Sequence, residues 1–197
     1  MAISDIMISP ARLLSAPLGT TLPADSLALE AAWPAGWLDV GYTAAPLSVE
    51  YTYEKTKKEI QESISLVGAK KSAESLKLET TLAEFTLDNI AHAWGGVVTE
   101  TPAGAGQVGK EEISGGDNTS IDQRMYGFEG SWEDDEGTLW PIRFIIFKGG
   151  VEVGGKLEFG KAVQTGIPLK IEAYADMTKS RGARLFKIVR ILEEALS

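Results

Sequence analysis

Residues 47–54, Leu-Ser-Val-Glu-Tyr-Thr-Tyr-Glu, alternate apolar and polar side chains without a break. Successive side chains of a β-strand point to opposite faces, so this period of two predicts a half-buried strand with one polar face. The same alternation recurs twice, with apolar rows at Leu76, Leu78 and Leu82 and at Ile167, Leu169, Ile171 and Ala173. Short strands separated by glycine-rich breaks predict an all-β fold of the sandwich or barrel type.

Three further segments complete the expected order of elements. Residues 139–147 are apolar on both faces toward their end, which predicts a central strand. Residues 82–94 have apolar side chains at helical spacing, with Thr86 as the expected N-cap and Gly95-Gly96 at the end, so we expect one flanking helix there. Residues 185–192 fit either a helix or a strand, and their β-branched content favours a strand.

The length of 197 residues suits one domain with short arms. We expect an N-terminal arm over residues 1–9, a β domain over residues 10–192 and a C-terminal tail over residues 193–197. Within the domain, the glycine-rich segment 101–120 is predicted to be a long loop. The strongly charged segment 55–62 is expected to connect two strands.

Composition excludes several classes of protein. Asp and Glu total 28 against 19 Lys and Arg, giving a net charge of −9, so binding of nucleic acid through a broad basic face is disfavoured. The chain has no cysteine and one histidine, His92, which rules out disulfides, thiolate metal sites and a multi-histidine metal site. The longest apolar run, residues 144–147, predicts no membrane-spanning helix, and the first ten residues lack the basic region of a secretory signal.

The candidate chemical motifs are better explained by structure than by catalysis. The Gly104-x-Gly106-x-x-Gly109 spacing fits a dinucleotide fingerprint, but no apolar helix follows it, so a loop is favoured. The acidic run 133–136 lacks the ligand spacing of a calcium loop and is interpreted as a charged hairpin turn. No Gly-x-Ser-x-Gly elbow accompanies His92. We therefore expect no enzyme, with no catalytic, cofactor-binding or metal-ligating residues and no cofactor.

Three short patterns stand in a distinctive order along the chain. They are Leu38-Asp39-x-Gly41-Tyr42-Thr43, then Thr81-Leu82-Ala83-Glu84 with Leu87, and finally Ile167-Pro168-Leu169 with Ala173 and Asp176. In this order the sequence resembles the major tail tube proteins of long-tailed bacteriophages, especially those with non-contractile tails. The resemblance covers residues 10–192 apart from segment 101–120.

The resemblance implies a β-sandwich or barrel domain whose sheets join across subunits into a ring, usually hexameric. Such rings stack into a hollow tube through which DNA passes at ejection. The implied partners are other copies of the chain, the tail terminator, tape measure and distal tail proteins, and passing DNA, without a membrane span. The implied location is the virion tail, after synthesis in the cytoplasm of a host bacterium.

The resemblance also gives roles to two sets of polar residues. We expect the polar strand faces to line an acidic lumen, which repels phosphates and lets DNA slide. The candidate lumen residues are Glu50, Thr52, Glu54, Lys77 and Glu79. The charged segment 55–62 is expected to bridge neighbouring rings through Lys55, Lys57, Lys58, Glu59 and Glu62.

Other classes of function remain open at this point. A tail terminator or decoration protein would share the virion setting but form one ring or a surface trimer. A carbohydrate-binding β-sandwich would use exposed tryptophan and tyrosine rings as stacking surfaces. A hydrolase with a carboxylate pair would need two acids at a defined separation, and no spacing in the sequence marks such a pair.

Overall fold

The computed structural model describes residues 11–58, 65, 67–117, 119–152, 156–157, 159 and 165–193. The first strands are β1 (Arg12–Pro17), β2 (Leu38–Asp39), β3 (Ser48–Lys58) and β4 (Gly68–Leu82), followed by the helix α1 (Leu87–Trp94). The later strands are β5 (Val97–Thr101), β6 (Lys110–Ser114), β7 (Gln123–Glu133), β8 (Leu139–Val151), β9 (Ile167–Ala173) and β10 (Phe186–Arg190). The expected all-β fold with one short helix is confirmed for this part of the chain.

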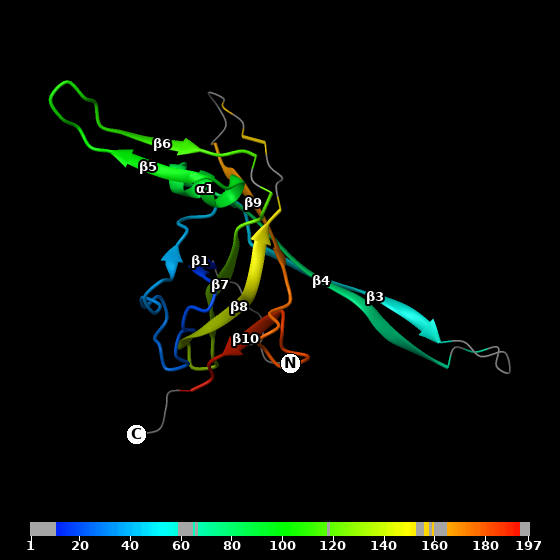
Figure 1. Cartoon of the computed structure of the whole chain (residues 1–197). Coiled ribbons are helices and arrows are strands. Elements are labelled where there is room, and N and C mark those ends of the chain that lie inside the picture. Colours follow the sequence, from blue (N-terminus) through cyan, green and yellow to red (C-terminus); the bar gives the residue numbers. More distant parts are fainter. Residues whose placement is uncertain are drawn as a thin grey trace.

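One antiparallel sheet dominates the molecule, with the strand order β2-β1-β7-β8-β9-β4-β3 (Figure 1). Strand β8 is shared on one side by two partners, because β10 pairs with residues 142–146 and β9 pairs with residues 149–151. Its other side pairs with β7. As predicted, β8 is a central strand, and its change of partner lets the sheet curve around a core.

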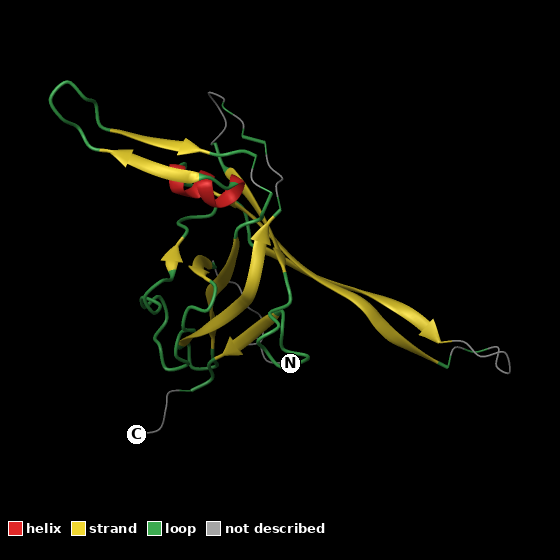
Figure 2. Cartoon of the chain, viewed as in Figure 1, coloured by secondary structure: helices red, strands yellow, loops and turns green. Residues whose placement is uncertain are grey.

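The main core lies between the curved sheet and the helix. It contains the alternating apolar residues of β4 and β9 that the sequence predicts to be buried, together with residues of β1, β7, β8 and α1. Helix α1 lies between the hairpin β5–β6 and the sheet (Figure 2). Thr86 caps the helix by accepting a hydrogen bond from Asn89 N, and Gly95 ends it with φ 80°, as predicted.

A second core covers the opposite face of β1, β7 and β8. Residues 18–37, which we call the strap, cross this face and bury Trp33 and Trp37 against it. Gly127 of β7 lies directly beneath the two rings, and a Cβ atom there would come within 2.4 Å of Trp33. The absence of a side chain at this position therefore lets the strap approach the sheet.

A row of three charged residues, two of them buried, fastens the strap. Arg12, Glu129 and Arg143 are cross-strand neighbours on β1, β7 and β8. The carboxylate of Glu129 accepts hydrogen bonds from Arg12 Nη2 at 2.7 Å and from Arg143 Nε at 2.9 Å. The side chains of Glu129 and Arg143 are each 1% exposed. We call these three residues the charge row.

The charge row also binds the strap's backbone. Arg143 donates hydrogen bonds to Ala24 O and Leu27 O, and Arg12 donates to Ala31 O. Glu129 accepts from the backbone N–H of Glu30 at 3.2 Å. Because buried ionic groups cost much free energy unless they are fully paired, this set of partners is what makes the charge row tolerable.

Several boundaries differ from the sequence-based expectation. Residues 55–58 belong to β3 rather than to a connecting loop, because pairing with β4 satisfies their backbone groups even though both faces are exposed. Part of segment 101–120 is likewise not a loop, since Lys110–Ser114 pairs with β5 in a hairpin. The helix begins at Leu87, whereas Leu82 ends β4. Residues 185–192 do contain a strand, β10, as expected.

The buried charge row gives a stability prediction. Replacing Glu129 with Gln removes the carboxylate between two guanidinium groups and leaves Arg143 buried without a counter-charge. We expect the free energy of unfolding to fall by about 3–5 kcal/mol, measured by urea denaturation. Glu136→Gln, on an exposed turn, is the matched control and should change stability by less than about 0.5 kcal/mol. Equal effects of the two variants would show that the charge row does not hold the strap.

Candidate functional site

The most unusual feature of the molecule is a long hairpin that leaves the body (Figure 1). Strands β3 and β4 pair along their length, from Ser48 opposite Glu79 to Lys58 opposite Gly68. All eleven residues of β3 are exposed, as are residues 68–74 of β4. We call residues 48–58 with 68–76 the arm. A polar, exposed two-stranded ribbon buries little apolar surface, so its shape is held mainly by backbone pairing.

One face of the arm continues onto the body as a surface of alternating charge. The register places Glu50 opposite Lys77 and Ser48 opposite Glu79 on β4. β4 in turn places Lys77 opposite Glu172 and Glu79 opposite Lys170 on β9. We call the outward side chains of these three strands, with Glu152 beside them, the charged face. The five predicted lumen residues, Glu50, Thr52, Glu54, Lys77 and Glu79, all fall on this face by alternation and register.

Both lysines near the centre of the charged face are paired with acids. Lys77 Nζ lies 3.2 Å from a carboxylate oxygen of Glu152 and 3.7 Å from one of Glu172. Lys170 Nζ lies 2.5 Å from Glu79. The hydrogen bond with Glu152 raises the pKa of Lys77, and the same contact with Lys77 lowers the pKa of Glu152. Both groups therefore stay charged.

The opposite face of the arm is apolar and uncovered. Val49, Tyr51 and Tyr53 are 42%, 41% and 54% exposed, although their alternation predicts a half-buried row. Tyr51 meets Phe186 of β10 edge-on, with ring centroids 6.1 Å apart. Lys71 Nζ donates a hydrogen bond to Tyr51 Oη at 2.8 Å and lies 4.8 Å from the centre of the Tyr53 ring. We call Val49, Tyr51 and Tyr53 the tyrosine row. The sequence predicts that this row is half-buried within a single chain, and that prediction is wrong.

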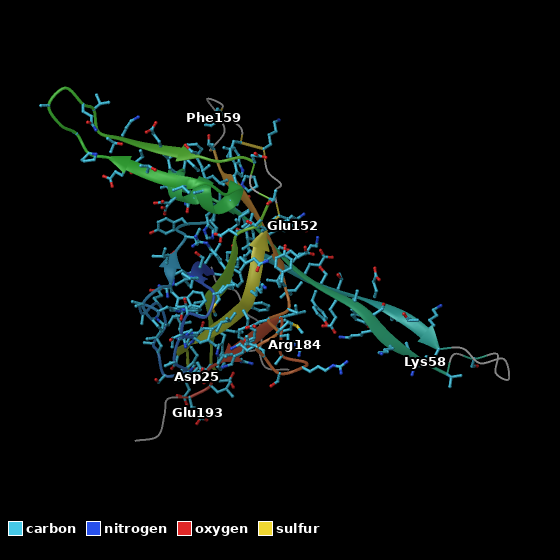
Figure 3. The ribbon with its side chains drawn as sticks, in the orientation of Figure 1. Asp25, Lys58, Glu152, Phe159, Arg184 and Glu193 are labelled. Carbon is cyan, nitrogen blue, oxygen red and sulfur yellow. The ribbon has the colours of Figure 1, made fainter. Side chains whose placement is uncertain are left out.

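The far end of the arm is basic (Figure 3, where Lys58 is labelled). Three of the predicted bridging residues, Lys55, Lys57 and Lys58, lie in the last part of β3. Lys70 and Lys71 lie on β4, and Lys55 directly faces Lys71 beyond a bulge in the hairpin. We call these five lysines the basic tip. Like charges directly opposite each other destabilise strand pairing, so the Lys55–Lys71 pair does not itself stabilise the end of the arm. Glu59 and Glu62 lie outside the described residues.

Two motifs considered for other chemistry prove structural. Gly104 and Gly106 lie in the turn between β5 and β6, so a strand follows them where the dinucleotide fingerprint would require a helix. Asp134 accepts hydrogen bonds from the backbone N–H groups of Glu136 and Thr138 and from Trp140 Nε1. It thereby fixes the predicted charged turn between β7 and β8. Among the described residues, no group of three or more His, Asp or Glu side chains could hold a metal ion.

His92 is packed rather than poised for catalysis. It lies on α1 with its ring edge-on to Tyr126 at 5.7 Å, and its Nε2 has no hydrogen-bond partner in the part of the chain that the structure describes. Burial lowers the pKa of His92 to about 4, with a smaller contribution from Arg124. The ring is therefore neutral at pH 7.

Sequence reasoning missed four residues of this region. Lys170 and Glu172 lie on the polar row of β9, but the pairing of β9 with β4 joins residues about ninety positions apart. Glu152 follows β8 outside any alternating pattern, and Lys71 was overlooked because its contact with Tyr51 depends on the fold of the hairpin. For Lys170 and Glu172 the sequence does carry a signal, the polar row that alternates with the apolar row of β9. That signal shows that these residues share a polar face, but it does not show that the face adjoins that of β4.

The low pKa of His92 gives a prediction about acid stability. Between pH 6.5 and about 4 the unfolded chain binds a proton at this histidine and the folded chain does not, so stability falls as pH drops through this window. We expect the native protein to lose on the order of 3 kcal/mol there, and His92→Gln to lose much less. Urea unfolding at pH 7 and pH 4.5 measures the difference. Identical pH dependence in both proteins would contradict burial of a neutral ring.

Comparison with known proteins identifies the family. Residues 5–187 match the family model described as phage tail tube protein. A search of curated proteins finds no match to the chain. The family model covers well over half of the sequence, so the chain belongs to the phage tail tube protein family and is a structural component of a phage tail.

Proposed function

We propose that this tail tube protein assembles into hexameric rings that stack into the tail tube, and that the lumen conducts DNA during ejection. The observation that carries the proposal is the exposure of strand β3. This strand ends the sheet, all its residues are exposed, and its apolar row stays at least 41% exposed despite the contacts of Tyr51 with Phe186 and Lys71. Long exposed edge strands are templates for pairing with another chain. A second copy would complete both the edge and the row.

The charged face is the surface we propose to line the lumen. It comprises Glu50, Glu54, Glu79, Glu152 and Glu172 against Lys77 and Lys170, so acids outnumber bases. An acidic, hydrated surface repels phosphates, whereas a basic one binds DNA by releasing its counterions. Glu50, Thr52, Glu54, Lys77 and Glu79 are accordingly proposed as lumen residues.

The basic tip is proposed to contact a neighbouring ring. Its five lysines occur in segments 55–58 and 67–71, which contain no acidic residue, although the chain as a whole has a net charge of −9. The net charge of another copy is therefore of opposite sign to the tip. The position of the tip at the far end of the arm gives it the reach to touch a subunit beyond its own body.

The remaining expectations follow from the same role. We propose the tail terminator, tape measure and distal tail proteins as partners, with synthesis in the host cytoplasm before assembly. A protein whose work is shape needs no active site or cofactor. No helix within the described ranges has the length and apolar character to cross a membrane.

The tyrosine row tests whether self-association uses this face. Replacing Tyr51 and Tyr53 together with Ser removes two exposed rings, so the folded monomer should keep its stability within about 1 kcal/mol. Rings or tubes about ten nanometres wide, the order of size expected for six such domains around a pore, should be lost in negative-stain micrographs. Tyr42→Ser, at a tyrosine 80% exposed outside the arm, is the control. Tubes from the double variant as abundant as those of the native protein would exclude this face as an interface.

Shortening the arm tests the basic tip. Glu54 pairs with Ala73, so an Asn-Gly turn can replace residues 55–72 and close the hairpin at that pair. We expect the body to fold with an unchanged melting temperature and single rings to form, while long tubes disappear. A second variant with Gln at Lys55, Lys57, Lys58, Lys70 and Lys71 keeps the length and removes the charge. Long tubes from the shortened protein would refute the bridging role.

A further inference from the structure

The charged face contains two lysines that a DNA phosphate would be expected to bind. Lys77 and Lys170 have side chains 35% and 38% exposed, so solvent reaches them. Each is held by carboxylates, Lys77 by Glu152 and Glu172 and Lys170 by Glu79.

Strand register determines the arrangement. Glu50, Lys77 and Glu172 form one row across β3, β4 and β9, so the lysine lies between two acids. Glu152 is fixed beside them because its backbone N–H donates to Lys170 O at 2.8 Å (Figure 3 labels Glu152). Glu172 also accepts a hydrogen bond from Ser75 Oγ. The carboxylates of Glu152 and Glu172 therefore both lie within 4 Å of the ammonium group of Lys77, and Glu50 is its cross-strand neighbour on β3.

Stability does not account for this arrangement. Ion pairs exposed to this degree typically contribute between zero and about 1 kcal/mol. An arrangement with no charges on this face would therefore fold about equally well. What the carboxylates do change is the sign of the surface that a passing polyanion meets.

We propose that Glu152 and Glu172 mask Lys77, and that Glu79 masks Lys170, so that neither of these two lysines is free to bind DNA. This inference rests on the proposed lumen role and assigns a function to residues on β9 and after β8. Lys55 of the basic tip is a contrast, because it faces Lys71 rather than an acid, whereas Lys71 is itself paired with Glu74 at 3.2 Å.

The first test measures masking directly on the folded chain. Lysines of the native protein and of Glu152→Gln/Glu172→Gln are acylated with an amine-reactive reagent, and the rate at Lys77 is followed by mass spectrometry of its peptide. A masked ammonium group reacts slowly, so the double variant should react several-fold faster at Lys77. The matched control is Glu111→Gln/Glu136→Gln, which removes two exposed acids away from the charged face. An unchanged rate at Lys77 in the double variant would overturn the proposal.

The second test measures DNA binding by assembled protein. A fluorescent 20-base-pair duplex is titrated into rings or tubes of each variant in 50 mM and 200 mM salt. We expect Glu152→Gln/Glu172→Gln to bind at least tenfold more tightly than the native protein at low salt and to lose this gain at high salt. Adding Lys77→Gln should abolish the gain. A gain that survives Lys77→Gln, or that equals that of the control pair, would overturn the role of masking.

The two failures are distinguishable. Micrographs of the same samples show whether the native protein assembles, which tests the proposed function. The acylation rate at Lys77 is read on single chains and does not depend on rings. Faster acylation without tighter DNA binding would show that the carboxylates cover Lys77 but do not control contact with DNA.

Discussion

The antiparallel pairing of β4 with β9 is the interaction on which the rest of the molecule depends. It joins Lys77–Leu82 to Ile167–Glu172 and buries leucines and isoleucines on one side while setting the charges on the other. Within the described residues β3 pairs with β4 alone, so the arm is attached to the body through this contact. A slip of one residue would bury the charges and expose the apolar row. Core formation and the pattern of the charged face are therefore specified together.

The body from which the arm projects is stiffened by a different device. The strap lets β1, β7 and β8 be buried on both faces, and the charge row fastens it through backbone carbonyls. A buried Glu between two Arg is not in itself stabilising, since apolar residues of the same shape often do as well. Here the guanidinium groups also satisfy strap carbonyls that would otherwise be buried without partners. The network thus defines one path for residues 18–37 across the sheet.

Elements with local signals were predictable from the sequence, and elements set by distant contacts were not. The alternation of β4 and β9, the Thr86 cap and the acidic turn were all visible, because period, capping and turn chemistry act within a few residues. The sequence predicts a connection rather than a strand at Lys55–Lys58, because fully exposed strand residues carry no apolar row that would mark them. The masking of Lys77 by Glu152 could not be foreseen, since it joins residues 75 positions apart that no pattern relates.

The tyrosine row combines a local sequence signal with a feature that only the folded structure shows. Its alternation indicates a face that is shielded from water, while the folded chain leaves that face 41–54% exposed. The strand thus has the apolar alternation of a buried face, but its own chain leaves that face exposed. This combination is what an interface with another chain requires. The neighbouring row of the same strand is polar and acidic, so covering one face leaves the other in water. A ring that buried the tyrosine rows between subunits would therefore present the charged faces elsewhere, which is the geometry that an acidic channel needs.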